Sequence, residues 1–212
     1  MKELDIKKIK AKAKEQIKNN WQDLFIGYIL FTIVVGALSS FGIGFILIGP
    51  ITVGFVSYMI KFNRKETYKI DNLIDGFKNN FENSLVAGIL QTVFVFLWSL
   101  LFIIPGIIKG ISYSMTYFII YDNPNLQGKD ALAKSEELMR GHKMEYFKLI
   151  LSFIGWIILS AFTFGILYIL YVGPYIEAAR VQFYEELKTF DVSRKQNNTI
   201  LDDQFKIDDS EF

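Results

Sequence analysis

Charged residues are almost absent from three long stretches of the chain and are crowded into the segments between them. The apolar stretches cover residues 24–60, 84–121 and 147–176. Each is too long for a single membrane crossing of about 20 residues and long enough for two. A soluble domain would interleave polar residues at helical or strand spacing, and these stretches do not. The pattern therefore predicts an integral membrane protein built from helical hairpins.

We predict an all-α membrane protein with six transmembrane helices in three hairpins, each hairpin preceded by an amphipathic interfacial helix. An N-terminal amphipathic basic helix is expected at 1–21, and a polar, partly disordered cytoplasmic tail at 188–212. The transmembrane domain, residues 22–187, is expected to cross at 24–40, 43–60, 84–104, 106–122, 146–163 and 164–184. The first apolar stretch exceeds the core of a signal peptide and a second apolar run follows at once, so we expect it to be retained.

Each apolar stretch follows a segment whose apolar residues recur at steps of three or four, which is the spacing of one helix face. The first segment carries lysines on its other sides and ends at Trp21, a residue suited to the depth of lipid headgroups. The three apolar faces consist of Ile6, Ile9, Ala13 and Ile17; of Ile70, Leu73, Ile74, Phe77 and Phe81; and of Ala131, Leu132, Ser135, Leu138 and Met139.

The same order of elements occurs three times, which indicates internal repetition. The first and third units share a Gly-Pro pair, at Gly49-Pro50 and at Gly173-Pro174, whereas the second unit matches poorly. The alternative is chance, because glycine, proline and aromatic residues recur in many membrane proteins. An aromatic residue marks each entry and a proline follows it, at Trp21 and Pro50, Phe81 and Pro105, and Tyr146 and Pro174.

Charge and composition narrow the choice of partners. Residues 1–20 carry seven lysines against three acids, although the net charge of the chain is only +1. This basic segment leads into a membrane stretch and lacks interleaved aromatics and arginines, so we expect it to bind anionic lipid headgroups and not nucleic acid. The chain has no cysteine and one histidine, His142, which excludes disulfides, thiolate chemistry and nearly all zinc sites.

Basic residues also predict the orientation. They cluster before the first stretch, at 61–78, at 129–143 and after Tyr175, whereas the turns within the hairpins carry none apart from Lys109. By the positive-inside rule, both termini and every linker are cytoplasmic and each hairpin reaches towards the far side. Almost nothing protrudes there, which makes a receptor for external macromolecules improbable.

Four polar residues within or next to the crossings are the candidate functional positions, because intramembrane polar groups are costly. Gln91 lies inside the third crossing, where its amide needs a partner from a neighbouring helix. Lys109 is expected at the outer interface as an anchor. Glu177 and Arg180 are three residues apart near the inner end of the last helix and are expected to pair. For the pair, a gate or a substrate contact is the alternative.

No catalytic set can be assembled from the remaining polar residues. The acids lie in the linkers and the tail, and neither a glycine-rich phosphate loop nor a nucleophile elbow occurs. The lone His142 is expected to be a solvated residue at a helix end. We therefore expect no enzyme activity, no catalytic residues, no cofactor and no metal site.

The third unit resembles a bacterial membrane family called domain of unknown function 975. The resemblance implies a polytopic protein of the bacterial cytoplasmic membrane and carries over no substrate or catalytic residue. One departure is Ile166-Leu167, where the family pattern has a second glycine after the isoleucine. The residues that carry the likeness are Ser135, Leu138-Met139, Gly141-His142-Lys143, Phe147, Ser152-Phe153-Ile154-Gly155-Trp156, Gly173-Pro174-Tyr175 and Phe183-Tyr184-Glu185-Glu186-Leu187, with Pro105-Gly106-Ile107-Ile108-Lys109, Tyr113-Ser114-Met115 and Asp122-Asn123-Pro124 upstream.

Two functions remain open on the sequence alone. The first is a non-enzymatic membrane protein that acts through lipid or partner contacts, as an accessory or scaffold to an envelope or export system. It would bind a membrane protein partner or form a homo-oligomer. The alternative is a transporter or channel for small solutes or ions, built from repeated hairpins, with the prolines and Gln91 as its motivating features.

Overall fold

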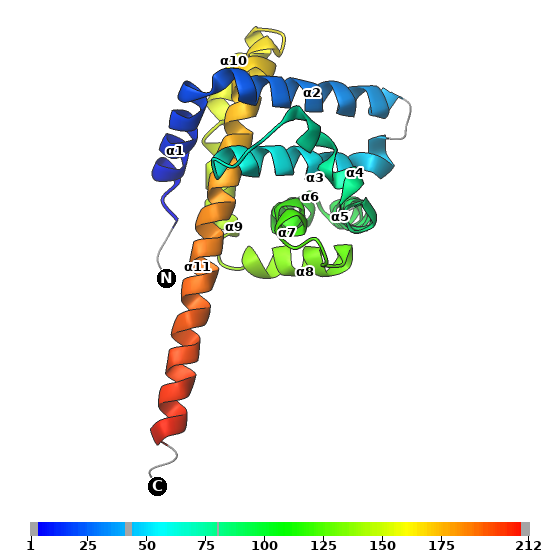
Figure 1. Ribbon diagram of the computed structural model, residues 1–212. Helices are drawn as coiled ribbons and strands as arrows, with labels where there is room; N and C mark the ends of the chain where they lie inside the picture. The colour runs from blue at the N-terminus through cyan, green and yellow to red at the C-terminus, as the bar shows by residue number, and fades with distance from the viewer. Residues whose placement is uncertain (1–3, 41–43, 80, 209–212) are drawn as a thin grey trace.

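The computed structural model describes residues 4–40, 44–79 and 81–208, and every regular element in these ranges is helical (Figure 1). The predicted boundary between the first two crossings, at 41–43, and the last four residues of the predicted tail lie outside these ranges. The elements are α1 (Ile6–Asn19), α2 (Trp21–Ser40), α3 (Gly44–Asn63), the 3-10 helix η1 (Ile70–Ile74), α4 (Asp75–Lys78), α5 (Phe81–Leu101), α6 (Ile103–Ser112), α7 (Thr116–Asp122), α8 (Gly128–Leu138), α9 (Lys143–Leu151), α10 (Ile154–Phe162), the π-helix η2 (Tyr168–Val172) and α11 (Gly173–Asp208).

Five segments of the described chain are long and apolar enough to cross a membrane: Trp21–Ser40, Ile46–Asn63, Phe81–Leu101, Ile103–Asp122 and Lys143–Phe162. The sixth predicted crossing, 164–184, is not among them, because Glu177 and Arg180 interrupt its apolar sequence. Its helix widens into η2 just before Pro174, whose ring and missing N–H disturb the regular hydrogen-bond ladder. Helix α11 then continues through most of the segment predicted as the tail.

Consecutive helices pack on one another in three pairs, and in the first two pairs the second helix is buried more deeply. Helix α2 packs on α3, α5 on α6, and α10 on η2. In α2, 17% of the apolar window is buried, against 67% in α3, and the corresponding values for α5 and α6–α7 are 17% and 56%. We call α2, α5 and α10 the outer helices. The inner helices are α3 in the first pair, α7, which follows α6, in the second, and α11, which follows η2, in the third.

The core forms where the inner helices meet. Phe55 of α3, Phe118 of α7 and Tyr184 of α11 are among the largest fully buried side chains, and the rings of Phe118 and Tyr184 lie 5.1 Å apart. The opposite ends of the pairs leave the core and are exposed, as at Ile103 and Phe164. In Figure 1 the pairs point in different directions, since α2 and α3 lie across the view whereas α5 and α7 are seen end-on.

The linker helices close this arrangement in a cyclic order. Helix α1, which precedes the first pair, packs on α11 of the third pair. η1 and α4, which precede the second pair, pack on α3 of the first, and α8, which precedes the third pair, packs on α7 of the second. Each linker therefore contacts the inner helix of another pair, and α8 also packs on the outer helix α5. The internal repetition stays a prediction.

The apolar faces of the linker helices differ in how far they are buried. Ile9, Ala13 and Ile17 of α1 are buried against the protein, as are Ala131 and Leu132 of α8, so these faces are not free to lie on a membrane. The second linker differs, because most of its apolar face remains exposed. The exposed residues are Ile70, Ile74, Phe77 and Phe81.

Small residues permit the close crossings. A Cβ added to Gly76 of α4 would lie 2.0 Å from the carbonyl oxygen of Pro50, and one added to Gly54 would lie 1.9 Å from that of Leu73. A Cβ added to Gly106 would meet Ser99 of the same pair, whereas one added to Gly110 would meet nothing within 4 Å, so Gly110 does not lie at a close crossing.

Candidate functional site

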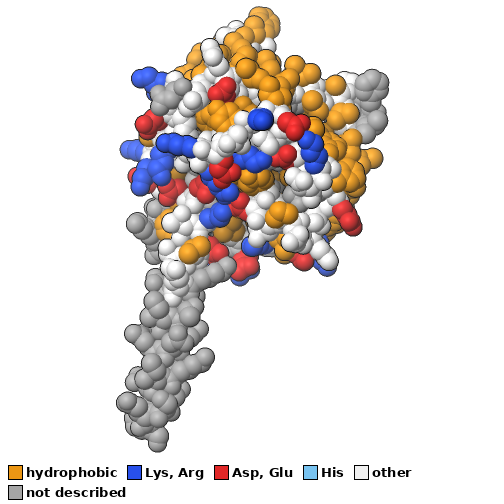
Figure 2. All heavy atoms as spheres, in the orientation of Figure 1, with side chains coloured by type: hydrophobic (Ala, Val, Ile, Leu, Met, Phe, Trp, Pro, Cys, Tyr) orange, Lys and Arg blue, Asp and Glu red, His pale blue; other side chains and the backbone are white. Residues whose placement is uncertain are grey.

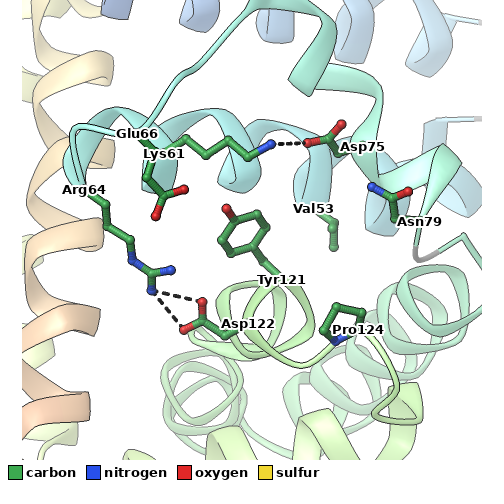
Figure 3. A pocket seen from close by; sticks show the side chains of 9 residues that line it. All are labelled: Val53, Lys61, Arg64, Glu66, Asp75, Asn79, Tyr121, Asp122 and Pro124. Carbon is green, nitrogen blue, oxygen red and sulfur yellow. Dashed lines mark hydrogen bonds and ion pairs between the residues drawn. The ribbon is translucent and has the colours of Figure 1, made fainter.

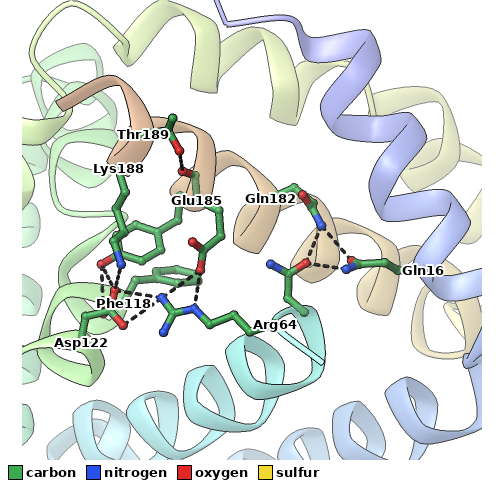
Figure 4. A network of polar contacts seen from close by, with 10 residues as sticks. Gln16, Arg64, Phe118, Asp122, Gln182, Glu185, Lys188 and Thr189 are labelled. Atoms are coloured by element: carbon green, nitrogen blue, oxygen red, sulfur yellow. Dashed lines mark hydrogen bonds and ion pairs between the residues drawn. The ribbon is translucent and has the colours of Figure 1, made fainter. Parts of the chain in front are cut away.

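The three inner helices are joined by a polar junction at their linker ends (Figure 4). Arg64 follows the last turn of α3 and donates from Nη2 to Asp122, the last residue of α7, with an N–O distance of 3.0 Å. Its Nε donates to Oε1 of Glu185 on α11 at 2.9 Å. Tyr184 and Lys188 of α11 also donate to Asp122. One guanidinium and one carboxylate thus hold all three inner helices, and the Asp122 side chain is only 11% exposed.

An amide cluster extends this junction towards α1. The side chain of Gln182 on α11 donates to Gln16 at 3.0 Å and also to Asn63 at the end of α3. Gln16 in turn donates to Asn63. Lys12 of α1 pairs with Glu186 nearby. The N-terminal helix is therefore fixed to the core by polar contacts as well as by its apolar face.

A second polar group lies beside the junction, between α3 and α4. Asp75 accepts hydrogen bonds from Ser57 at 2.5 Å, from Lys61 at 3.0 Å and from Asn72 at 3.0 Å. Burial of the carboxyl raises its pKa, but these hydrogen bonds and the positive charge of Lys61 outweigh burial, so the pKa of Asp75 lies below its ordinary value. Asp75 is therefore a charged tie between the second linker and the first inner helix.

A cavity of about 570 Å³ separates the Asp75 group from the Arg64–Asp122 pair (Figure 3). Tyr121 stands between the two ion pairs, and Val53, Glu66, Asn79 and Pro124 complete the lining. The two cations of the lining, Lys61 and Arg64, already have carboxylate partners. Within the described residues, no group of three or more histidine, aspartate or glutamate side chains is placed to hold a metal ion. The arrangement ties the helices together at their linker ends.

Glu177 and Arg180 pair as their spacing predicts. Nη1 of Arg180 donates to both carboxylate oxygens of Glu177, at 2.9 and 3.0 Å, and its Nη2 points to the carbonyl oxygen of Ser114 at 3.4 Å. The guanidinium also lies over the ring of Phe118, 5.7 Å from its centroid. The pair therefore packs inside the protein, against the break between α6 and α7.

Lys109 lies next to a linker helix. Its Nζ is 2.7 Å from Oε1 of Glu136 on α8, and it also lies over the rings of Trp98 and Tyr113. The sequence placed Lys109 at the outer interface and the 129–143 linker in the cytoplasm. In the folded chain Lys109 and the linker touch, so they cannot lie on opposite sides of a membrane.

Gln91 is the least satisfied of the four candidate positions. Its Oε1 is buried and has no hydrogen-bond partner within the described chain. The expected partner from a neighbouring helix is therefore not seen for this oxygen. The four candidates do not form one site, because Glu177 and Arg180 pair with each other whereas Lys109 pairs with α8.

The expectation for His142 was right in placing it at a helix end and wrong in describing it as solvated. This residue is the N-cap of α9, and its side chain is only 14% exposed. Its Nδ1 lies 2.5 Å from Glu145, which also accepts the backbone N–H of Leu4 at 3.0 Å. The histidine is therefore part of the contact that holds the start of the described chain, because Leu4 is itself buried.

Sequence reasoning missed Arg64, Asp75, Asp122 and Gln182. These residues lie next to the ends of apolar stretches, where charged and amide side chains are usually interpreted as solvated residues of a linker. The available signal was position: Arg64 and Asp122 both fall at the end of the second apolar helix of a unit. Nothing in the sequence indicates that these ends meet.

In its described residues the chain is helical, its apolar helices suit a membrane, and several of its charges tie helices together. A family model matches residues 1–112 and 100–191, and the chain belongs to that family, which is described as a protein of unknown function (DUF975). The resemblance seen in the third unit is thereby confirmed. No curated protein and no solved structure matches the chain.

Proposed function

We propose that the protein acts in a bacterial cytoplasmic membrane through lipid or partner contacts, as an accessory or scaffold and not as an enzyme. The observation that carries this proposal is the division of the surface. The ends of the helix pairs expose large apolar side chains, including Phe102, Ile103 and Phe164, whereas the charges around the core are used as ties. Such a surface supports embedding and contact more directly than it supports turnover of a substrate.

In this proposal the basic linkers and both termini are cytoplasmic, and the exposed lysines of α1 contact anionic headgroups. Lys7, Lys8, Lys14 and Lys18 are exposed even though the apolar face of the same helix is buried in the protein. A salt-sensitive attraction of about 1 kcal/mol per lysine is expected near an anionic surface.

The lipid contact is tested with the purified protein in detergent. Adding phosphatidylglycerol should raise the Tm, and changing the four α1 lysines together to glutamine should remove most of that rise. The matched control changes Lys129 and Lys134, which are exposed on α8. An equal rise in all three proteins would contradict a site on α1.

A transporter is the second candidate, favoured by the buried and unpartnered Oε1 of Gln91. A bound solute or water could supply the missing donor at that position. The two functions are separated by reconstituting the purified protein alone in liposomes. Solute flux that disappears in Gln91→Leu would favour transport, and it would overturn the contact proposal. Absence of flux for ions and small osmolytes is the result that the contact proposal expects.

A further inference from the structure

The linker helices pack part-way along the helix pairs. The position of each contact limits how deeply the pair can enter a bilayer. In the second pair, Oγ of Ser135 on α8 donates to the carbonyl oxygen of Ser112 at 2.8 Å, and Glu136 holds Lys109. The outward face of α8 bears Lys129, Asp130, Lys134 and Glu137, all exposed, and such a face belongs in water or among headgroups. Ser112 must therefore lie near the membrane surface. From Ser112 to Phe102, at the tip, ten residues of helix cover about 15 Å.

The third pair is limited in the same way. In the third, the basic helix α1 touches both arms: Nζ of Lys10 donates to the carbonyl oxygen of Ser152 at 3.2 Å, and Tyr175 donates to the carbonyl oxygen of Lys10 at 3.1 Å. Twelve residues from Ser152 to the tip at Phe164 cover about 18 Å. The hydrocarbon of a bilayer is about 30 Å thick.

The tips have the chemistry of hydrocarbon and not of a turn in water. Phe102, Ile103 and Phe164 are 71%, 75% and 98% exposed. Figure 2 shows the apolar surface gathered over the end near α10 and along one side, with the charged side chains concentrated elsewhere on this face. A loop that emerged into water would ordinarily carry polar or charged residues.

The third tip also satisfies its own backbone. The N–H groups of Thr163, Phe164 and Gly165 bond to carbonyls of the preceding turn at 2.9–3.2 Å, and the N–H of Leu167 bonds to Oγ1 of Thr163 at 3.1 Å. Such local satisfaction is what a turn needs inside hydrocarbon, where no water can replace a missing bond. Phe164 itself has a φ of 50°, an unfavourable backbone for an aromatic residue, and it contributes almost nothing to the protein core.

We infer that the second and third helix pairs enter the bilayer from the linker side and end among the acyl chains without crossing to the far side. The inference rests on the membrane location given in the proposed function. Length and composition alone would allow five crossings in the described chain, but in these two pairs the contacts of α8 and α1 leave too little helix beyond the linker level. Because the pairs diverge from a common core, the protein displaces more lipid in the near leaflet than in the far one.

Cysteine scanning tests this inference directly, because the chain has no cysteine of its own. Phe102→Cys and Phe164→Cys probe the tips, and Lys134→Cys and Lys14→Cys are controls on exposed linker positions. Each variant is treated with a membrane-impermeant maleimide in spheroplasts, where the outer face is accessible, and in inverted vesicles. The controls should react only in inverted vesicles. The tips should react in neither, and should become reactive after denaturation in detergent.

Two results would overturn the inference. A tip cysteine that reacts in spheroplasts has crossed the membrane, and one that reacts in inverted vesicles has not entered it. Extraction with alkaline carbonate is done first. Release of the wild-type protein would contradict the membrane location itself, so that failure is distinct from a failure of the insertion depth alone. A fluorophore on Phe164→Cys should also be quenched more strongly by nitroxides near the acyl-chain ends than by nitroxides on headgroups, and the reverse order would count against the inference.

Discussion

Gly49 on α3 and Gly88 on α5 meet backbone to backbone. A Cβ added to Gly88 would lie 2.8 Å from the Cα of Gly49, and one added to Gly49 would lie 1.9 Å from the carbonyl oxygen of Ser84. The first inner helix and the second outer helix can approach this closely only because neither residue has a side chain. This crossing fixes the second pair against the first.

Gly49→Ala should therefore destabilise the protein by about 1–3 kcal/mol, because the methyl group pushes α3 and α5 apart. The measurement is the Tm of the purified protein in detergent. Gly36→Ala is the matched control, since a Cβ there meets nothing within 4 Å and alanine is the better helix former. The control should be neutral or slightly stabilising; equal losses in both variants would argue against the crossing.

Asp75→Asn should cost about 1–3 kcal/mol, because Lys61 loses its carboxylate partner in a partly buried position. The comparison is Asp71→Asn, which breaks the more exposed pair with Lys78. Exposed pairs contribute about 0–1 kcal/mol, so this second variant should unfold nearly as the wild type does. Chemical denaturation in detergent measures both. If Asp71→Asn were the more damaging of the two, the role given to Asp75 would be wrong.

The lowered pKa of Asp75 predicts that the protein becomes less stable in acid. The pKa of Asp75 in the folded protein lies below its ordinary value of 3.8, so its contribution is fully present above that pH. The contribution is lost as the pH falls through the lower, folded pKa. The Tm should fall on acidification below about pH 4, and Asp75→Asn should flatten that fall. An unchanged acid slope in the variant would assign the effect to other carboxylates.

Arg64→Gln should destabilise the junction by about 2 kcal/mol, since Asp122 and Glu185 both lose a charged donor. Arg64→Lys should lose less, because it keeps the charge but not the forked geometry that spans two carboxylates. Arg140→Gln, at an exposed position, is the control and should change little. In thermal unfolding, we expect the Tm to fall most in Arg64→Gln, less in Arg64→Lys and least in Arg140→Gln.

Ala13→Glu should release α1 from α11, because this residue is fully buried and most of the packing of α1 is against α11. A buried unpaired carboxylate costs several kcal/mol, so detachment of the helix is the cheaper outcome. Limited trypsin digestion should then cut at the lysines of α1 faster than in the wild type. Ala11→Glu introduces the same group at an exposed position two residues away and should leave the digestion unchanged.

Much of the element pattern could be predicted from the sequence, and its spatial arrangement could not. The apolar stretches indicated helices, and helices occupy them. Which helix of a pair lies inside also has a weak signal, because the inner helices carry small polar residues such as Ser57 and Thr116, which are fully buried. The directions of the pairs depend on contacts such as Gly49 with Gly88, and these carry no local pattern.

The candidate site was less predictable than the fold. The Glu177–Arg180 pair follows from helix periodicity, since its partners are three residues apart. The Arg64–Asp122 pair joins residues 58 positions apart in sequence. Both residues sit where a linker begins, and a sequence offers no means to tell a solvated charge from one that folding will bring beside an opposite charge.

The packing of α1 on α11 has a consequence for biogenesis. Helix α1 is synthesised well before α11, on which most of its packing surface lies. Until α11 has been synthesised, much of the apolar face formed by Ile9, Ala13 and Ile17 lacks its cover, so the nascent basic helix is free to rest on the lipid surface or on a chaperone. The contact of the apolar face of α1 with lipid is then a stage in assembly. That stage ends when α11 packs on α1.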